Sequence, residues 1–79
     1  MGATVQVRDN VFGPEVSTIA AGEAVEWRWS GQNPHNVTGD GYASTTRDSG
    51  VYVRSFERPG TYFYRCTIHT HMLGEVVVR

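Results

Sequence analysis

The sequence predicts an all-β fold, a Greek-key β-sandwich of about seven short strands. Apolar and polar residues alternate within short segments, and turn-forming residues separate these segments. No segment has the 3.6-residue period of an amphipathic helix, and neither a heptad nor an internal repeat is present. A chain of 79 residues can enclose one small core, so we expect a single domain over residues 1–79.

The strands are expected wherever this alternation appears. It is strongest from Val25 to Trp29, where Trp27 and Trp29 share one face and are expected in the core. Residues 9–15 and the Gly-, Asp-, Ser- and Thr-rich segment 39–50 are predicted to be connections without strands. The other predicted strands lie around Val5 and Val7, from Val16 to Ala20, from His35 onward, from Val51 to Phe56, from Thr61 to Cys66 and from Glu75 to Arg79.

The strand that ends at Cys66 has two distinct faces. Tyr62, Tyr64 and Cys66 are predicted to share one face, with Phe63 and Arg65 on the other. We expect the two tyrosines to pack in the core and one of their hydroxyls to cap a loop.

Charge and composition exclude several classes of protein. The net charge is −1, and the 7 basic residues are all arginines without a run, which argues against nucleic-acid binding and a polybasic membrane segment. No stretch approaches the ~20 apolar residues of a membrane helix. The first residues lack the charged and apolar regions of a signal peptide. The single cysteine excludes an intramolecular disulfide.

Sulfur and imidazole donors are concentrated in one short segment. Cys66, the only cysteine, is followed by His69, His71 and Met72, and His35 lies upstream. A thiolate, two imidazoles and a weak methionine form the ligand set of a blue-copper electron-transfer centre. Two strand ends and one tight loop would hold such a metal rigidly, which suits electron transfer because the geometry need not change. We therefore expect one copper ion per chain, bound by His35, Cys66, His69 and Met72.

Other interpretations of the same residues remain open. Zinc could use Cys66, His35, His69 and His71, although a methionine sulfur is a poor zinc ligand and favours copper. Without a metal, Cys66 would be a small buried hydrophobe and Met72 would fill a gap in the core. For His71, we favour an exposed loop histidine over a ligand.

The residues around these donors resemble the cupredoxin superfamily of small blue-copper proteins, most of all amicyanins and plastocyanins. The likeness lies in the segments Val25-Glu26-Trp27, Pro34-His35-Asn36-Val37, Pro59–Cys66 and Cys66–Gly74. The step of three from His69 to Met72 is similar to the amicyanin spacing. The resemblance implies three equatorial ligands, His35, Cys66 and His69, and Met72 as the axial one.

This chain also departs from the family. The segment between His35 and Cys66 is short, Ile68 stands where many relatives carry proline, and His71 occupies a position that is apolar in close relatives. The resemblance implies that the backbone N–H of Asn36 donates to the Cys66 sulfur, and Ile68 can donate where proline cannot. We therefore expect Ile68→Pro to lower the reduction potential. The Asn36 side chain is expected to tie its strand to the ligand loop near Thr67.

The resemblance implies a one-electron carrier rather than an enzyme. Its partners would be redox proteins that meet an apolar patch around His69, formed by Pro34, Ile68 and Leu73 together with Phe12. It further implies a monomer in the periplasm or outside the cell, with neither nucleic-acid binding nor a membrane span. The alternatives are a module for copper binding or delivery, and a cupredoxin domain excised from a larger copper oxidoreductase.

Overall fold

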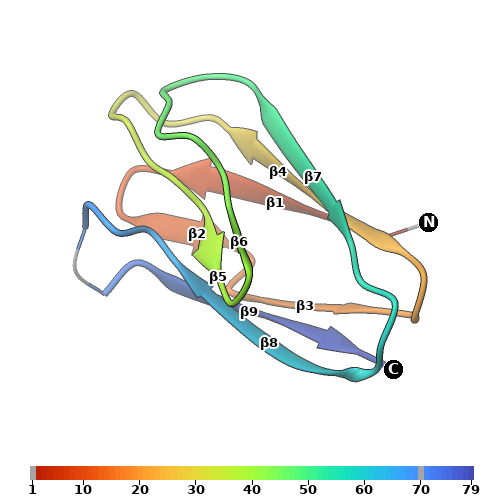
Figure 1. The fold of residues 1–79 in the computed structure, drawn as a ribbon. Helices are drawn as coiled ribbons and strands as arrows, with labels where there is room; N and C mark the ends of the chain where they lie inside the picture. Colours follow the sequence, from red (N-terminus) through yellow and green to blue (C-terminus); the bar gives the residue numbers. More distant parts are fainter. Residues whose placement is uncertain (1, 70) are drawn as a thin grey trace.

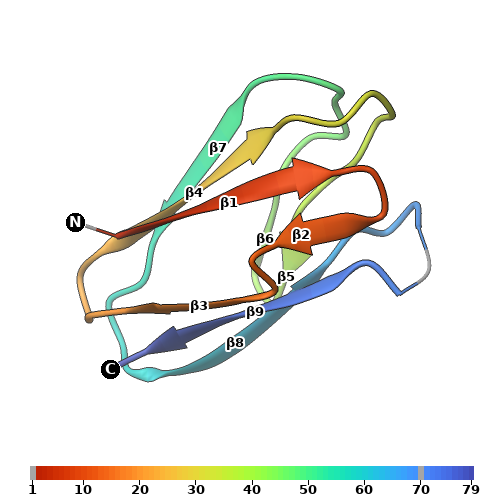
Figure 2. The ribbon, with the colours of Figure 1, turned by 180° about the vertical axis from the view of Figure 1, so that it is seen from behind.

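Two β-sheets pack face to face, as the computed structural model shows for residues 2–69 and 71–79 (Figure 1). Seen from behind, the same two layers enclose the core (Figure 2). The four-stranded sheet has the order β2-β1-β4-β7, and the five-stranded sheet has the order β3-β9-β8-β5-β6. The strands are β1 (Ala3–Arg8), β2 (Val11–Gly13), β3 (Val16–Ile19), β4 (Ala24–Trp29), β5 (Thr38–Gly39), β6 (Tyr42–Ala43), β7 (Val51–Ser55), β8 (Gly60–Arg65) and β9 (Leu73–Val78).

Both sheets are mixed. In the four-stranded sheet, β1 runs parallel to β4 and antiparallel to β2, and β4 runs antiparallel to β7. In the five-stranded sheet, β9 lies between β3, to which it is parallel, and β8, to which it is antiparallel. The predicted all-β sandwich is thus confirmed.

The core is built from the inward-facing residues of the alternating strands. Trp27 is fully buried in β4, between the buried Val25 and Trp29. In β8, Tyr64 is buried while Phe63 is 68% exposed, so the predicted division of faces in this strand is confirmed. Tyr62 donates its hydroxyl to the carbonyl of Arg58 at 2.7 Å, which is the expected loop cap.

Two short strands lie in segments predicted to lack them. β2 forms inside the turn-rich connection 9–15, and β6 lies in the polar segment 39–50, which β5 also enters at Gly39. They are two or three residues long, which is too short for alternation to be visible in the sequence. His35 forms only an isolated bridge with Arg47, so the strand predicted to start there begins at Thr38 instead.

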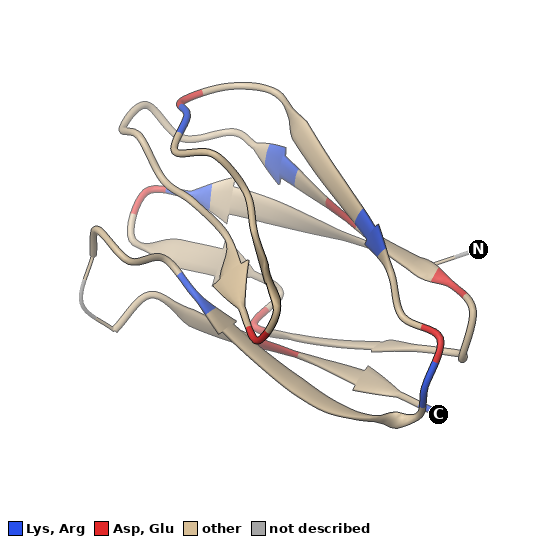
Figure 3. Ribbon diagram, in the orientation of Figure 1, with Lys and Arg blue, Asp and Glu red and all other residues tan. Residues whose placement is uncertain are grey.

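Charged residues of both signs are spread over the ribbon (Figure 3). Neither sign dominates one face in this view, as expected from a sequence whose arginines form no run. Within the part of the chain that the structure describes, no helix is long and apolar enough to cross a membrane.

Candidate metal centre

Three connections meet at one end of the sandwich, away from the marked chain ends (Figure 1, Figure 2). They are the β1–β2 turn at residues 9–10, the segment 30–37 after β4, and the loop 66–72 between β8 and β9. The predicted donors His35, Cys66, His69 and Met72 lie in the second and third of these.

The backbone of His35 is held on two sides. Its N–H and carbonyl pair with Arg47 at 2.9 and 3.0 Å, and its carbonyl also accepts the indole N–H of Trp29 at 3.0 Å. The Arg47 guanidinium in turn lies 5.3 Å from the centre of the Trp29 ring. His35 is fully buried as a result.

The two ring nitrogens of His35 have different neighbours. Nε2 lies 2.9 Å from Oδ1 of Asp9, and Nδ1 lies 3.9 Å from Sγ of Cys66. The hydrogen bond from His35, with those from the backbone N–H groups of Asn33 and Gln32, lowers the pKa of Asp9 to about 2. The Asp9 carboxylate is therefore charged at neutral pH.

Cys66 is buried, with 3% of its surface exposed. Its N–H donates to the carbonyl of Met72 at 3.0 Å and closes the base of the loop. Its sulfur accepts the backbone N–H of Asn36 at 3.5 Å, as the resemblance implies. In the part of the chain described, no hydrogen bond joins Ile68 to this sulfur. The expected effect of Ile68→Pro on the reduction potential therefore loses its physical basis.

The side chain of Asn36 joins the two connections that carry the donors. Its Nδ2 donates to Oγ1 of Thr67 at 2.8 Å, and its Oδ1 accepts the backbone N–H of Thr67 at 3.1 Å. It also donates to Oγ1 of Thr46 at 3.1 Å. The predicted brace near Thr67 is confirmed.

His69 and Met72 complete the predicted set. The ring centre of His69 lies 4.6 Å from that of His35, and its buried Nε2 has no hydrogen-bond partner among residues 2–69 and 71–79. Met72 is fully buried. His71 is exposed, with a φ of 68°, which agrees with the expected loop histidine.

The His35–Cys66 pair fits a metal ion. A thiolate sulfur and an imidazole nitrogen lie 3.9 Å apart in a buried position, and both are donor types of a blue-copper site. Among residues 2–69 and 71–79, however, no three His, Cys, Asp or Glu side chains form a complete site. The ring of His69 lies beside the pair, with its centre 4.6 Å from that of His35.

Some apolar side chains are exposed at this end of the molecule. Pro34 is exposed, Ile68 is 50% exposed and Leu73 is 57% exposed, and the latter two line a shallow hollow that also contains His69. Phe12, expected in the same patch, is fully buried. Its ring packs edge-on against Tyr64, with centres 4.8 Å apart, so this part of the prediction is wrong.

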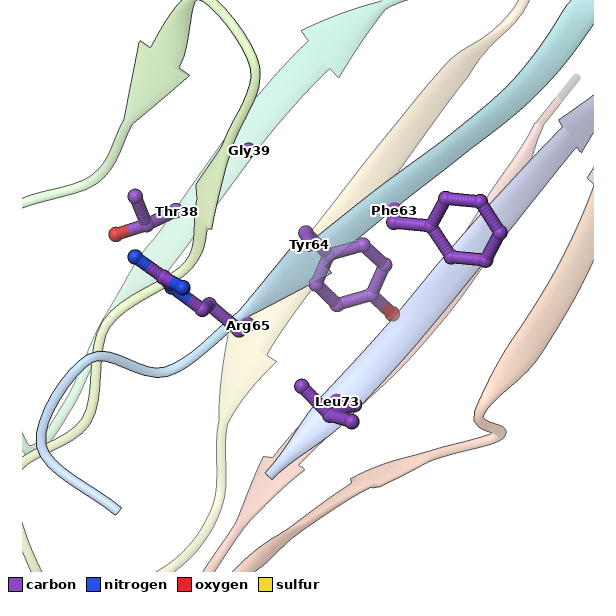
Figure 4. A pocket seen from close by; sticks show the side chains of 6 residues that line it. All are labelled: Thr38, Gly39, Phe63, Tyr64, Arg65 and Leu73. Atoms are coloured by element: carbon purple, nitrogen blue, oxygen red, sulfur yellow. The ribbon is translucent and has the colours of Figure 1, made fainter. Parts of the chain in front are cut away.

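A second hollow continues the apolar surface along the five-stranded sheet (Figure 4). Arg65 and Leu73 line both hollows, so the two hollows meet at these residues. The second hollow is lined by Thr38, Gly39, Phe63, Tyr64, Arg65 and Leu73.

Reasoning from the sequence missed three residues that hold His35: Asp9, Trp29 and Arg47. Trp29 was expected only as core, and nothing in the sequence pattern links a turn aspartate to a histidine 26 residues away. Knowing that the β1–β2 turn lies beside segment 30–37 would have suggested this contact. That proximity arises from the tertiary fold and has no local pattern in the sequence.

Comparisons with known proteins find relatives by sequence and by structure. No family model matches the sequence. The chain is 42% identical over 73 residues to amicyanin-alpha of Methylorubrum extorquens and 39% identical over 74 residues to amicyanin of Paracoccus versutus. Both alignments cover 82% of this chain but only 60% and 54% of those relatives. The chain therefore spans little more than half the length of the curated relatives it matches.

A solved structure shares the fold over nearly its whole length. The purple cupredoxin from Nitrosopumilus maritimus superposes with a TM-score of 0.89 at 22% identity, covering 98% of this chain and 99% of that one. The structural likeness alone establishes a common fold. The chain is thus similar to amicyanins in sequence and shares the fold of a cupredoxin.

Proposed function

We propose that the chain carries single electrons between proteins through one copper ion bound by His35, Cys66, His69 and Met72. The observation that carries the proposal is the buried pair of His35 Nδ1 and Cys66 Sγ, 3.9 Å apart. Thiolate and imidazole, with a second imidazole and a thioether close in the same loop, are the donor types of a blue-copper site. The likeness to amicyanins supports the same assignment.

The residues of the chain would hold the donors, and copper would supply a reversible one-electron couple. The backbone hydrogen bond between Cys66 and Met72 and the hydrogen bonds between Asn36 and Thr67 fix the loop from both sides. Among the described residues, the buried Nε2 of His69 has no hydrogen-bond partner, which supports this ring as a further donor. A frame held in this way changes little between oxidation states.

A carrier, not an enzyme, is the role that the donors support. If four donors bind copper, the exposed His71 is the remaining histidine of the 3 in the chain. One histidine is too few for the second metal site of an oxidase. By likeness to its relatives, the chain would act as a monomer in the periplasm or outside the cell.

The proposal is tested by adding Cu(II) to the metal-free chain while recording visible absorption and electron paramagnetic resonance. An intense blue band with narrow hyperfine splitting, complete at one equivalent, is expected because thiolate ligation produces both. Voltammetry should then show a reversible one-electron wave. A pale spectrum at one equivalent would refute thiolate ligation, and a blue centre without a reversible wave would leave a copper-binding module instead of a carrier.

The exposed apolar surface around His69 is proposed as the route for electrons. Leu73→Lys should slow electron self-exchange between oxidised and reduced copies about tenfold, because like charges then meet at the docking face. Nuclear magnetic resonance line broadening in mixtures of the two oxidation states measures this rate without a known partner.

The matched control is Val53→Lys. Val53 is 56% exposed and lies in β7 of the other sheet. The lysine variant therefore adds the same charge far from His69. Its self-exchange rate should stay within about twofold of the original, since distant exposed charges are largely screened. Equal slowing by both variants would place the electron route elsewhere.

A further inference from the structure

The turn between β1 and β2 places a carboxylate against the buried ring of His35. Oδ1 of Asp9 lies 2.9 Å from Nε2 of His35, on the ring nitrogen that does not face Cys66. The Asp9 side chain is 35% exposed while that of His35 is fully buried. The pair therefore joins the surface of the protein to the inside of the candidate metal centre.

Asp9 is fixed by contacts of its own. Its carboxylate accepts the backbone N–H of Asn33 at 2.9 Å and that of Gln32 at 3.1 Å. A Cβ atom on Gly31 would lie 2.5 Å from Oδ1, so the glycine allows the backbone to approach this closely. On the other side, Asn10 completes the turn with a φ of 67°, a conformation that asparagine tolerates better than most residues. The carboxylate is thus in place before any metal arrives.

The chemistry of a carboxylate decides which nitrogen of His35 carries a proton. An ionised carboxylate only accepts hydrogen bonds, so Nε2 must be the N–H donor. In the neutral ring, Nδ1 then has a free lone pair. That lone pair belongs to the nitrogen 3.9 Å from the Cys66 sulfur.

We propose that Asp9 is a positioning residue that selects Nδ1 of His35 as the metal-binding atom and orients its ring toward Cys66. A carboxylate on the outer nitrogen of a ligating histidine fixes its tautomer and makes it a stronger donor. The inference rests on the proposed function, because it takes His35 to be a ligand. The competing role for Asp9 is only to cap the turn at residues 32–33.

Two variants separate these roles. Asp9→Asn keeps an oxygen that accepts hydrogen bonds but removes the charge, and Asp9→Ala removes both. Asp40→Asn makes the same chemical change in the exposed β5–β6 turn and is the matched control. Urea unfolding of each metal-free variant measures how much the fold itself depends on Asp9.

The tautomer is measured first, in the metal-free chain, by nitrogen–proton correlation spectra of the histidine rings. The original chain and Asp40→Asn should show His35 protonated at Nε2 with Nδ1 free. Asp9→Ala should show a mixture of tautomers, and Asp9→Asn should lie between. An unchanged His35 tautomer in both Asp9 variants, with only stability lowered, would overturn the proposal. If Asp9→Ala does not fold, Asp9→Asn decides.

Copper affinity is measured second, by competition with a chelator for Cu(I). Asp9→Ala should weaken binding about 10- to 100-fold, with a smaller loss for Asp9→Asn, because loss of such a carboxylate partner typically has this effect. Asp40→Asn should bind like the original chain. Equal affinity in all variants would overturn the proposal even if the tautomer changes. Failure of the original chain to bind copper would refute the proposed function, and the tautomer measurement would still decide how Asp9 acts on the ring.

Discussion

Cys66→Ser should abolish the intense blue absorption of the copper-loaded chain and broaden its hyperfine splitting. The band arises from charge transfer between a thiolate and copper, and a hydroxyl provides no comparable donor. Cys66 is the single cysteine of the chain, so no other thiol can take its place. Serine is close in size to cysteine, and the metal-free variant should remain folded by circular dichroism.

The control for this experiment lies in the same loop. His71→Asn removes an imidazole at an exposed position with a φ of 68°, and asparagine is one of the residues that adopt this conformation most readily. The blue band and the reduction potential should both be unchanged. Loss of the band in His71→Asn would make His71 a ligand and remove Met72 from the proposed set. A blue band that survives Cys66→Ser would end the blue-copper assignment.

Trp27→Ala should remove most of the stability of the metal-free fold. The Trp27 side chain is fully buried, and four aromatic rings surround it: Tyr42, Tyr52, Phe56 and Tyr64, with centres 5.2–6.5 Å away. Replacing a buried tryptophan with alanine typically costs about 3–5 kcal/mol. Since native proteins have roughly 5–15 kcal/mol in total and small domains are marginal, the urea midpoint should fall well below that of the original chain.

Phe63→Ala is the matched control for this loss. Phe63 is an aromatic residue of β8 that is 68% exposed, so its removal leaves no cavity. The Phe63→Ala substitution should change the free energy of unfolding by less than about 1 kcal/mol, as most surface substitutions do. Trp27→Phe gives a measurable intermediate if the alanine variant does not fold. A loss below about 1 kcal/mol for Trp27→Ala would contradict the central place of this ring in the core.

The sequence predicts the fold class because alternation is a local signal. In β4, Val25, Trp27 and Trp29 are buried, and in β8, Tyr62 is half-buried and Tyr64 is buried. Both strands were predicted from this alternation. The parallel pairings of β1 with β4 and β3 with β9 join segments far apart in the chain. No local pattern encodes these pairings, so the sheet order had to come from the structure.

The candidate site was predictable to a similar extent. The types of donor residue and their spacing can be read directly from the sequence. The resemblance to cupredoxins then predicted which donors are equatorial ligands and which is axial. The supports of His35 were not predictable, because Asp9, Trp29 and Arg47 reach it by tertiary contacts. Phe12 was misplaced on the surface because the short strand β2, which turns it into the core, was read as a loop.

The hydrogen bond between Cys66 and Met72 divides the site into parts that can evolve at different rates. Below it, the ladder pair of Arg65 and Leu73 ends the β8–β9 hairpin. The described residues between Cys66 and Met72 therefore form a separable tip, and lengthening a loop raises its closure entropy only slowly. Natural variation can shift the second imidazole along this tip while both sheets stay intact. His35 has no such freedom, because its place depends on several elements at once.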